Sequence, residues 1–168
     1  MIMINTRVRP AVAGDAPQMV KLLNDIIAAG GTTAHQTPLD NATMRSHYIA
    51  RANCVSCHVA ISNGKLSGFQ SLNWASDGDP MPDGWAVIAT FVGLDRAKQG
   101  IGQKLFSATR FAAKDAGVTT IDATIRADNV GGLKYYNGLR FADYAEIPNL
   151  PLTDGTLVTR IRKKISLA

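Results

Sequence analysis

The chain has 168 residues, of which 46% are hydrophobic and 18% charged, with a net charge of +5 and two cysteines. This length and composition predict one globular domain over residues 1–168 with its own core, and no apolar run is long enough to cross a membrane. The basic residues are spread along the chain except at 160–164, which argues against a nucleic-acid partner.

Hydrophobic periodicity and turn residues predict the elements of the first half. A strand over 6–10 precedes a helix that begins near Asp15, whose side chain can cap it. After that helix come a Gly- and Thr-rich loop, a second helix, and two strands that form a hairpin around Asn63-Gly64. Their expected ranges are 15–29 (helix), 30–38 (loop), 41–52 (helix), 54–61 and 66–74 (strands).

The second half continues the alternation of strands and helices after a Gly/Pro-rich loop. The expected ranges are 76–84 (loop), 85–92 (strand), 100–116 (helix), 119–126 (strand), 129–138 (helix), and 140–146 and 156–164 (strands). In the last strand Arg160 and Arg162 alternate with Thr159 and Ile161, which is typical of an edge strand with one solvated face. Helices interleaved with mostly antiparallel strands predict a three-layer α/β (α+β) domain.

The segment Cys54-Val55-Ser56-Cys57-His58 matches the pattern of covalent haem attachment. It lies in a predicted strand, where alternate side chains point to opposite faces, so we expect Cys54 and Cys57 on opposite sides of the sheet. Such a placement excludes haem, a metal site and a disulfide, and favours free thiols in a reduced cytoplasmic protein. The N-terminus shows no signal-peptide pattern, which agrees with that location.

The most informative segment follows the strand over 85–92, where Gly100-Ile101-Gly102 opens a helical pattern. Amides at a helix N-terminus have no intrahelical partner, and the helix dipole adds partial positive charge there. Glycines let a phosphate approach the backbone closely. The sequence therefore predicts a site for a phosphate-bearing cofactor, with Gly102 close to the pyrophosphate.

A second segment, 129–141, combines with the glycine loop to give a family resemblance. The loop is similar to the Arg/Gln-x-x-Gly-x-Gly/Ala motif of the GNAT superfamily of N-acetyltransferases. The later segment resembles its Asn-x-x-(small)-x-x-x-Tyr-x-x-x-Gly-Phe motif, with Asn129, Tyr136 and Phe141 in the matching places. Arg9-Pro10-Ala11, Asp15-Ala16-Pro17, Gly64, Gly68 and Phe69 extend the resemblance, while Asn24-Asp25 and Gly31-Thr32-Thr33 are similar to the phosphinothricin acetyltransferase branch.

Two positions depart from the family pattern. Ala97 stands where an Arg or Gln is usual, and Lys98 and Gln99 beside it are the candidates to replace that side chain. Arg140 replaces the usual Gly before Phe141. Neither departure removes the backbone amides, which make most of the phosphate contacts in such a loop.

The resemblance implies a GNAT-like fold with a bulged central strand, acetyl-CoA as cosubstrate and no metal. The pantetheine arm would pair with the strand end, the pyrophosphate would lie over the loop, and Asn129 would bind the arm or fix a neighbouring loop. The residues implied to bind the cofactor are Phe91, Val92, Lys98, Gln99, Gly100, Ile101, Gly102, Gln103 and Asn129. Tyr136 falls on the position of the acid that protonates the departing thiolate, and Tyr135 is expected to face the core.

The general base and the acceptor are not identified by the sequence. The strand over 85–92 has no carboxylate, so the base could be ordered water, His35 or Asp83, with Glu146 a weaker candidate. By position, the acceptor pocket would include Thr32, Thr33, His35, Trp74 and Trp85. The expected partner is a small-molecule amine, and a homodimer is left open.

Three functions compete at this point. The first is acetyl transfer from acetyl-CoA to the amino group of a small molecule, and the second is a non-catalytic CoA-binding sensor or structural module. The third is a dinucleotide-binding domain. It is the weakest, because Leu105 stands where the third glycine would be and no acidic residue lies at the ribose distance.

Overall fold

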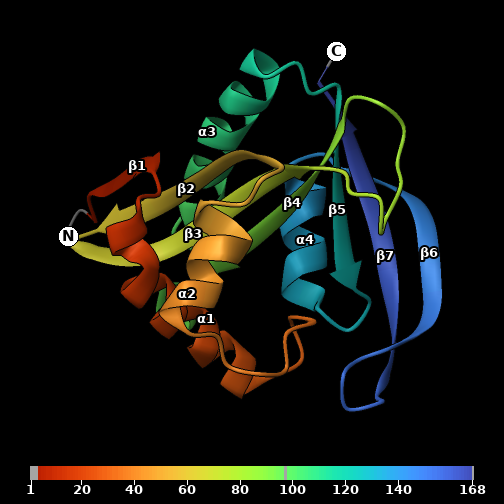
Figure 1. Cartoon of the computed structure of the whole chain (residues 1–168), viewed down its shortest axis with the longest axis horizontal. Coiled ribbons are helices and arrows are strands. Elements are labelled where there is room, and N and C mark those ends of the chain that lie inside the picture. The colour runs from red at the N-terminus through yellow and green to blue at the C-terminus, as the bar shows by residue number, and fades with distance from the viewer. Residues whose placement is uncertain (1–3, 97, 168) are drawn as a thin grey trace.

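The computed structural model describes residues 4–96 and 98–167. Within them a seven-stranded sheet has the order β1-β2-β3-β4-β5-β7-β6, from β1 at the left to β6 at the right of Figure 1. The strands are β1 (Thr6–Pro10), β2 (Cys54–Ser62), β3 (Lys65–Trp74), β4 (Trp85–Val92), β5 (Thr120–Arg126), β6 (Ala142–Pro151) and β7 (Leu157–Ser166). β4 and β5 pair in parallel, and the other neighbours pair antiparallel.

Helices cover both faces of the sheet. They are α1 (Ala16–Ala29), α2 (Asn41–Met44), α3 (Ile101–Asp115) and α4 (Val130–Gly138), with short turns η1 (Ala13–Asp15), η2 (Arg45–Ile49) and η3 (Leu94–Arg96). None of the helices within the described residues has both the length and the apolar character that a membrane crossing requires. The predicted three-layer α/β fold with a mostly antiparallel sheet is confirmed.

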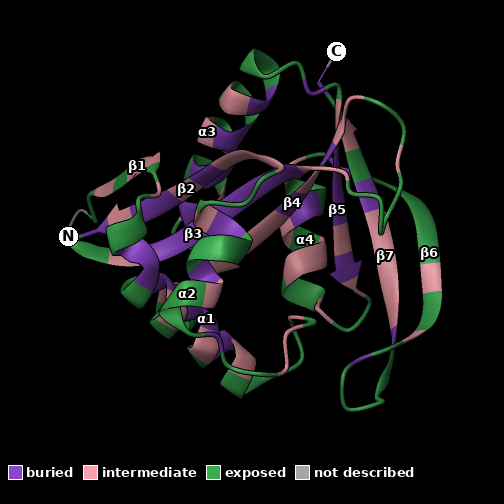
Figure 2. Ribbon diagram, viewed as in Figure 1, coloured by how far each residue is buried: buried purple, intermediate pink, exposed green. Residues whose placement is uncertain are grey.

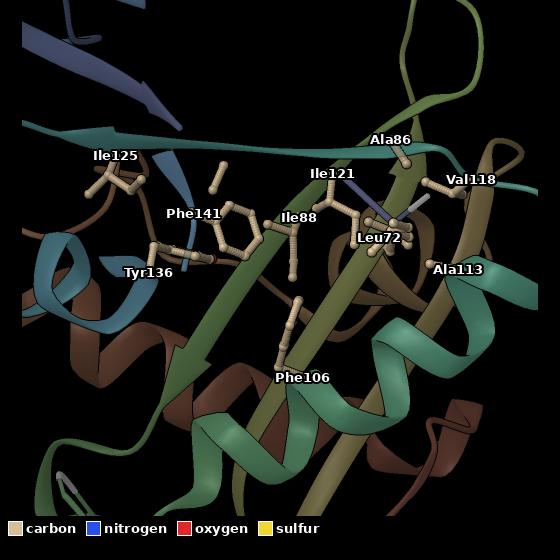
Figure 3. Packing of buried hydrophobic residues seen from close by; sticks show 12 residues of the cluster. Leu72, Ala86, Ile88, Phe106, Ala113, Val118, Ile121, Ile125, Tyr136 and Phe141 are labelled. Atoms are coloured by element: carbon tan, nitrogen blue, oxygen red, sulfur yellow. The ribbon is translucent and has the colours of Figure 1, made fainter. Parts of the chain in front are cut away.

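Alternation along β4 divides the core between the two faces. Ile88 joins Phe106 of α3 and Tyr136 of α4 in one cluster, and Figure 3 shows Tyr136 extending from α4 toward β4 beside Phe141. The next odd-numbered residues, Ala89 and Phe91, pack against the cluster beneath α1 and α2. Figure 2 shows the buried residues concentrated in the middle strands and the exposed ones along β6.

Most predicted elements are present with nearly the predicted ends, including β1 and β4. β6 runs on to Pro151 instead of ending near residue 146, and two details near the N-terminus also differ. The second helical segment ends at Ile49 rather than near residue 52. The side chain of Asp15 does not cap α1. It accepts hydrogen bonds of 2.8 and 2.9 Å from the Arg9 guanidinium and one of 2.8 Å from the Val12 amide, because the ion pair turns the carboxylate back toward β1.

The prediction of a bulged central strand is wrong for β4. Its register with β3 is continuous from Val92 opposite Gly68 to Ala86 opposite Trp74. The register shifts lie in the β2–β3 and β6–β7 pairs instead. β4 and β5 part after Val87, where their ladder ends, since the twist between neighbouring strands carries unpaired segments apart.

The predicted edge position of the last strand is also wrong. β7 pairs with β5 on one side and β6 on the other, so β6 forms this edge of the sheet. The side chain of Arg162 is consequently only 13% exposed. A local alternation pattern does not reveal which strand inserts between two others, because that order depends on pairing over a distance.

The two cysteines lie on the same side of the sheet, contrary to the prediction. A register shift between Cys54 and Ser56 interrupts the alternation of β2, since a bulge places two residues opposite one. Cys57 is buried in the cluster beneath α1, and Cys54 packs against that same cluster. Both are free thiols, and burial raises the pKa of Cys57 to about 12, so its thiol is a poor nucleophile.

Candidate active site

The sheet is open between β4 and β5. The last ladder pair joins Val87 to Asp122, whereas the other side of β4 stays paired with β3 up to Val92. Backbone N–H and C=O groups over 88–92 therefore have no strand partner toward β5, and such groups require hydrogen bonds. The side chains of Phe91 and Val92 pack into the core, so these residues could contact a ligand in the opening through their backbone.

The N-terminus of α3 follows the end of β4 and is suited to an anion. Gly100 is the N-cap, with φ of 75°, and among the described residues no side chain caps the first turn. The first amides, those of Ile101, Gly102 and Gln103, have no intrahelical acceptor. Lys98 and Gln99 are exposed next to them, while Ile101 is 1% exposed and offers only its amide. The family departure at Ala97 lies outside the described residues.

Gly102 touches Tyr135 of α4. A β-carbon at Gly102 would lie 2.5 Å from Tyr135 Cε2, and the Tyr135 hydroxyl donates a 2.7 Å hydrogen bond to the Gly102 carbonyl. Tyr135 packs against the core as expected, and burial raises the pKa of its hydroxyl to about 12. The glycine is therefore required by the helix contact, independently of any phosphate.

Tyr136 is 6% exposed and lies at the β4 side of α4. Its hydroxyl is 2.8 Å from that of Thr90, on the stretch of β4 that has no β5 partner. Burial raises the pKa of Tyr136 well above the usual 10. The hydroxyl is thus protonated at neutral pH and can donate a proton at the opening.

Asn129 fixes a neighbouring loop. Its side-chain oxygen caps α4 by accepting from the Gly132 amide at 2.9 Å, and its amide group donates to the Thr32 carbonyl at 3.2 Å. Arg126 donates to the Thr33 carbonyl at 3.2 Å. These two contacts hold the loop after α1 against the end of β5, which is one of the two roles expected for Asn129.

A cavity of about 300 Å³ lies on the α1–α2 face of the sheet, against Val87, Ile88 and Ala89 of β4. His35 and Trp74, two of the residues expected in the acceptor pocket, line it. The other lining residues are His47, Tyr48, Arg51, Asn53, Ser71, Asn73, Ser76 and Asp79. A larger hollow of about 460 Å³ at the β1–β2 edge does not border β4, so it is remote from the opening.

Thr33 and Trp85, also expected in the acceptor pocket, do not line this cavity. The Thr33 hydroxyl accepts a hydrogen bond from the His35 amide, and its carbonyl accepts from Arg126. Trp85 packs edge-on against Tyr144 of β6, with Lys164 5.4 Å above its ring. Position in the chain suggested both, but the β6–β7 hairpin covers Trp85, and the loop directs the Thr33 carbonyl to Arg126 at the end of β5. The Thr32 carbonyl likewise holds the loop in place, by accepting a hydrogen bond from the Asn129 side chain.

Ser71 and Asn73 are pocket residues that the sequence reasoning missed. Both are buried, and Ser71 Oγ and Asn73 Oδ1 have no hydrogen-bond partner among the described residues. They stand opposite Ala89 and Val87 of β4. The available signal in the sequence was the pair of polar residues on one face of β3, at positions 71 and 73. Buried polar groups without hydrogen-bond partners are costly, so such a pair indicates a binding site.

Of the candidate bases, His35 is the one that lines the cavity; Asp83 and Glu146 do not. Its Nε2 is 2.7 Å from the Tyr48 hydroxyl. Burial, and secondarily His47, lower the pKa of His35 below its usual 6.5. The imidazole is therefore neutral at pH 7.

Arg162 ties the loop before β4 to the sheet. It donates two hydrogen bonds to Asp79, at 3.1 and 2.8 Å, and two to Asp122, at 3.2 and 3.5 Å. Asp122 is fully buried. Tyr144 also donates to Asp122. Asp79 lines the cavity, but both of its carboxylate oxygens accept hydrogen bonds from Arg162. Its role is therefore structural, and it is not a candidate for the general base.

Comparisons with known proteins agree with this geometry. The profile of the Acetyltransferase (GNAT) family matches residues 20–141. No curated protein sequence matches significantly.

Solved structures with the same fold include three that cover nearly all of the chain. A candidate acetyltransferase of Salmonella typhimurium, yncA, solved with acetyl-CoA, has 20% identity and a TM-score of 0.83 over 97% of this chain and 94% of its own. An N-acetyltransferase of Staphylococcus aureus Mu50 has 19% identity and a TM-score of 0.82 over 98% and 99%. A phosphinothricin acetyltransferase of Sinorhizobium meliloti, in complex with AcCoA, has 16% identity and a TM-score of 0.83 over 97% and 89%.

The opening between β4 and β5, the uncapped helix start and the match over most of the sequence lead to one conclusion. The chain belongs to the acetyltransferase (GNAT) family.

Proposed function

We propose that this protein transfers an acetyl group from acetyl-CoA to the primary amino group of a small molecule in the cytoplasm. The observation that carries the proposal is the opening beside β4, which has an uncapped helix start at one end and a polar cavity against its other face. The free thiols of Cys54 and Cys57 suit a reducing compartment.

Three features support acetyl-CoA as the cosubstrate. The first amides of α3 and the nearby Lys98 suit the pyrophosphate. The free backbone of β4 beyond Val87 suits the amide groups of the pantetheine arm. Two of the similar proteins were solved with acetyl-CoA bound.

The reaction needs a nitrogen lone pair on one side of the thioester and a proton on the other. The amine attacks the carbonyl carbon, a C–N bond forms, the C–S bond breaks and the nitrogen releases a proton. Tyr136, buried beside Thr90 on β4, donates its proton to the departing thiolate. The neutral His35 in the cavity takes up the proton from the nitrogen, directly or through water.

The cavity favours a small acceptor with N–H groups. Its volume of about 300 Å³ is at the lower end for small-molecule sites, which argues against an extended protein substrate. Ser71 Oγ and Asn73 Oδ1 can accept hydrogen bonds and lack partners in the described residues. An amino group would satisfy both next to Ala89 and Val87 of β4.

Thiol release from acetyl-CoA, measured with and without amines, tests the proposal. The panel comprises the proteinogenic amino acids, ethylamine, ethanolamine, putrescine and glucosamine. We expect at least one amine to raise the rate in a saturable manner and to yield the N-acetyl product by mass spectrometry. Binding of acetyl-CoA with no amine-dependent release would contradict catalysis and favour a CoA-binding module.

A further inference from the structure

A continuous line of hydrogen bonds joins the first turn of α3 to Tyr136. The Tyr135 hydroxyl is 2.7 Å from the Gly102 carbonyl and 3.1 Å from Gln70 Nε2. The same nitrogen of Gln70 is 2.8 Å from the Thr90 hydroxyl, which is 2.8 Å from the Tyr136 hydroxyl. Gln70 is fully buried, its Nε2 makes both of these contacts, and its Oε1 has no hydrogen-bond partner among the described residues.

The Gly102 carbonyl sets the direction of the bonds from Tyr135 to Thr90. A carbonyl only accepts, so Tyr135 gives its one hydrogen to Gly102 and must accept from Gln70. The amide nitrogen of Gln70 then donates its second hydrogen to Thr90. Because Thr90 accepts from Gln70, its own hydrogen is available to another group.

The Thr90 hydroxyl is 2.8 Å from the Tyr136 hydroxyl, and by geometry either oxygen can be the donor. Thr90 also lies close to Tyr135; burial raises the pKa of Tyr135 to about 12, and Gln70 and Thr90 oppose that rise. The hydrogen bond that Thr90 makes to a tyrosine, however, is the one to Tyr136. With Thr90 as the donor, Tyr136 accepts this bond, and its own hydrogen then has no other hydrogen-bond acceptor among the described residues.

We propose that Thr90 donates the hydrogen bond to Tyr136, and that Thr90 and Gln70 are positioning residues that keep the Tyr136 proton free for the leaving thiolate and stabilise the phenolate left behind. This inference rests on the proposed function, in which Tyr136 is the acid. When the proton leaves Tyr136, the bond from Thr90 becomes a hydrogen bond to an anion, which is stronger than a neutral one. Burial opposes formation of that anion, so the donor matters most in the transition state.

The test is a double-mutant cycle on acetyl transfer to the best amine of the panel. Thr90→Val keeps the shape of the side chain but removes its donor, and we expect kcat to fall about ten- to a hundredfold with KM for acetyl-CoA nearly unchanged. Thr90→Ser keeps the hydroxyl and should restore most of kcat. In a Tyr136→Phe background Thr90→Val should have almost no further effect, because the group it assists is gone.

Each of the other possible results rejects either the positioning role of Thr90 or the acid role of Tyr136. If Tyr136→Phe slows the reaction but Thr90→Val turns over at the parent rate, this inference fails and the proposed function stands. Equal losses from Thr90→Val in the parent and Tyr136→Phe backgrounds would assign Thr90 a merely structural role. A parent rate in Tyr136→Phe, or no acetylated amine at all, rejects the acid role together with this inference. Thr90→Ala serves as the second donor-free variant should Thr90→Val unfold.

Discussion

A β-carbon on Gly102 would lie 2.5 Å from Cε2 and 3.0 Å from Cζ of Tyr135. The first turn of α3 and the aromatic face of α4 are thus in contact at a position that only glycine can fill without displacement. The hydroxyl of the same tyrosine holds the Gly102 carbonyl. The glycine of the expected phosphate loop is therefore also a packing residue between two helices.

Gly102→Ala should lower the free energy of unfolding by about 1–3 kcal/mol, because the added methyl group displaces the Tyr135 ring. Urea denaturation followed by circular dichroism measures the change. Gly138→Ala, where a β-carbon meets nothing within 4 Å, is the matched control and should leave stability unchanged or raise it by up to about 1 kcal/mol. Equal stability of Gly102→Ala and the parent would contradict the contact.

Tyr135→Phe and Tyr136→Phe should separate stability from turnover. Tyr135→Phe removes the donor to the Gly102 carbonyl and an acceptor of Gln70, which should cost about 1–3 kcal/mol of unfolding free energy. Tyr136→Phe should instead lower kcat by about a hundredfold, the low end for positioned acid catalysis. Urea denaturation and steady-state kinetics on both variants measure the two effects. A loss of kcat in Tyr135→Phe and a loss of stability alone in Tyr136→Phe would make Tyr135 the acid and Tyr136 the packing residue.

Asn73→Leu and Ser71→Ala should each raise KM for the amine about tenfold, since each removes one hydrogen-bond acceptor from the cavity. KM for acetyl-CoA should change little. Ser56→Ala is the control, because Ser56 Oγ is also buried without a partner but does not line the cavity. An unchanged amine KM in both cavity variants would place the amino group elsewhere.

His35 should make stability depend on pH below neutrality. Its folded-state pKa is lowered by burial, so above the unfolded value of about 6.5 the imidazole is neutral in both states. As the pH falls through 6.5, the unfolded chain binds a proton that the folded protein resists, and the free energy of unfolding decreases until the folded pKa is reached. The difference in urea stability between pH 7.5 and 5.5 should be smaller in His35→Gln.

Burial also lowers the pKa of His58. His58 therefore contributes independently to the loss of unfolding free energy at acid pH. His58→Gln should therefore reduce it as well, and the double variant should reduce it further. An acid sensitivity identical in His35→Gln and the parent would show that His35 is not buried as described.

CoA and acetyl-CoA, but not NAD, should stabilise the protein against heating. A ligand at about a hundred times its dissociation constant adds roughly 2.7 kcal/mol to the stability of the folded state. Differential scanning fluorimetry measures the shift in Tm. A shift with NAD and none with CoA would contradict the cofactor assignment.

The sequence alone determined the elements and the loop that suits phosphate. β1 and β4 begin and end where alternation and flanking turn residues predicted, and the glycine pair opens α3 as expected. These features depend on neighbouring residues, because backbone conformation and periodic burial are set within a few positions of each residue.

Tertiary structure decided which residues meet. The insertion of β7 between β5 and β6 brings Arg162 to Asp79, residues far apart in the chain. The register shift in β2 turned both cysteines to one side, and the pairing of β3 with β4 set Ser71 and Asn73 beside the opening. Strand order, bulges and the convergence of side chains arise from long-range pairing, whose free energy depends on the whole sheet. A local pattern of residues therefore cannot predict this pairing.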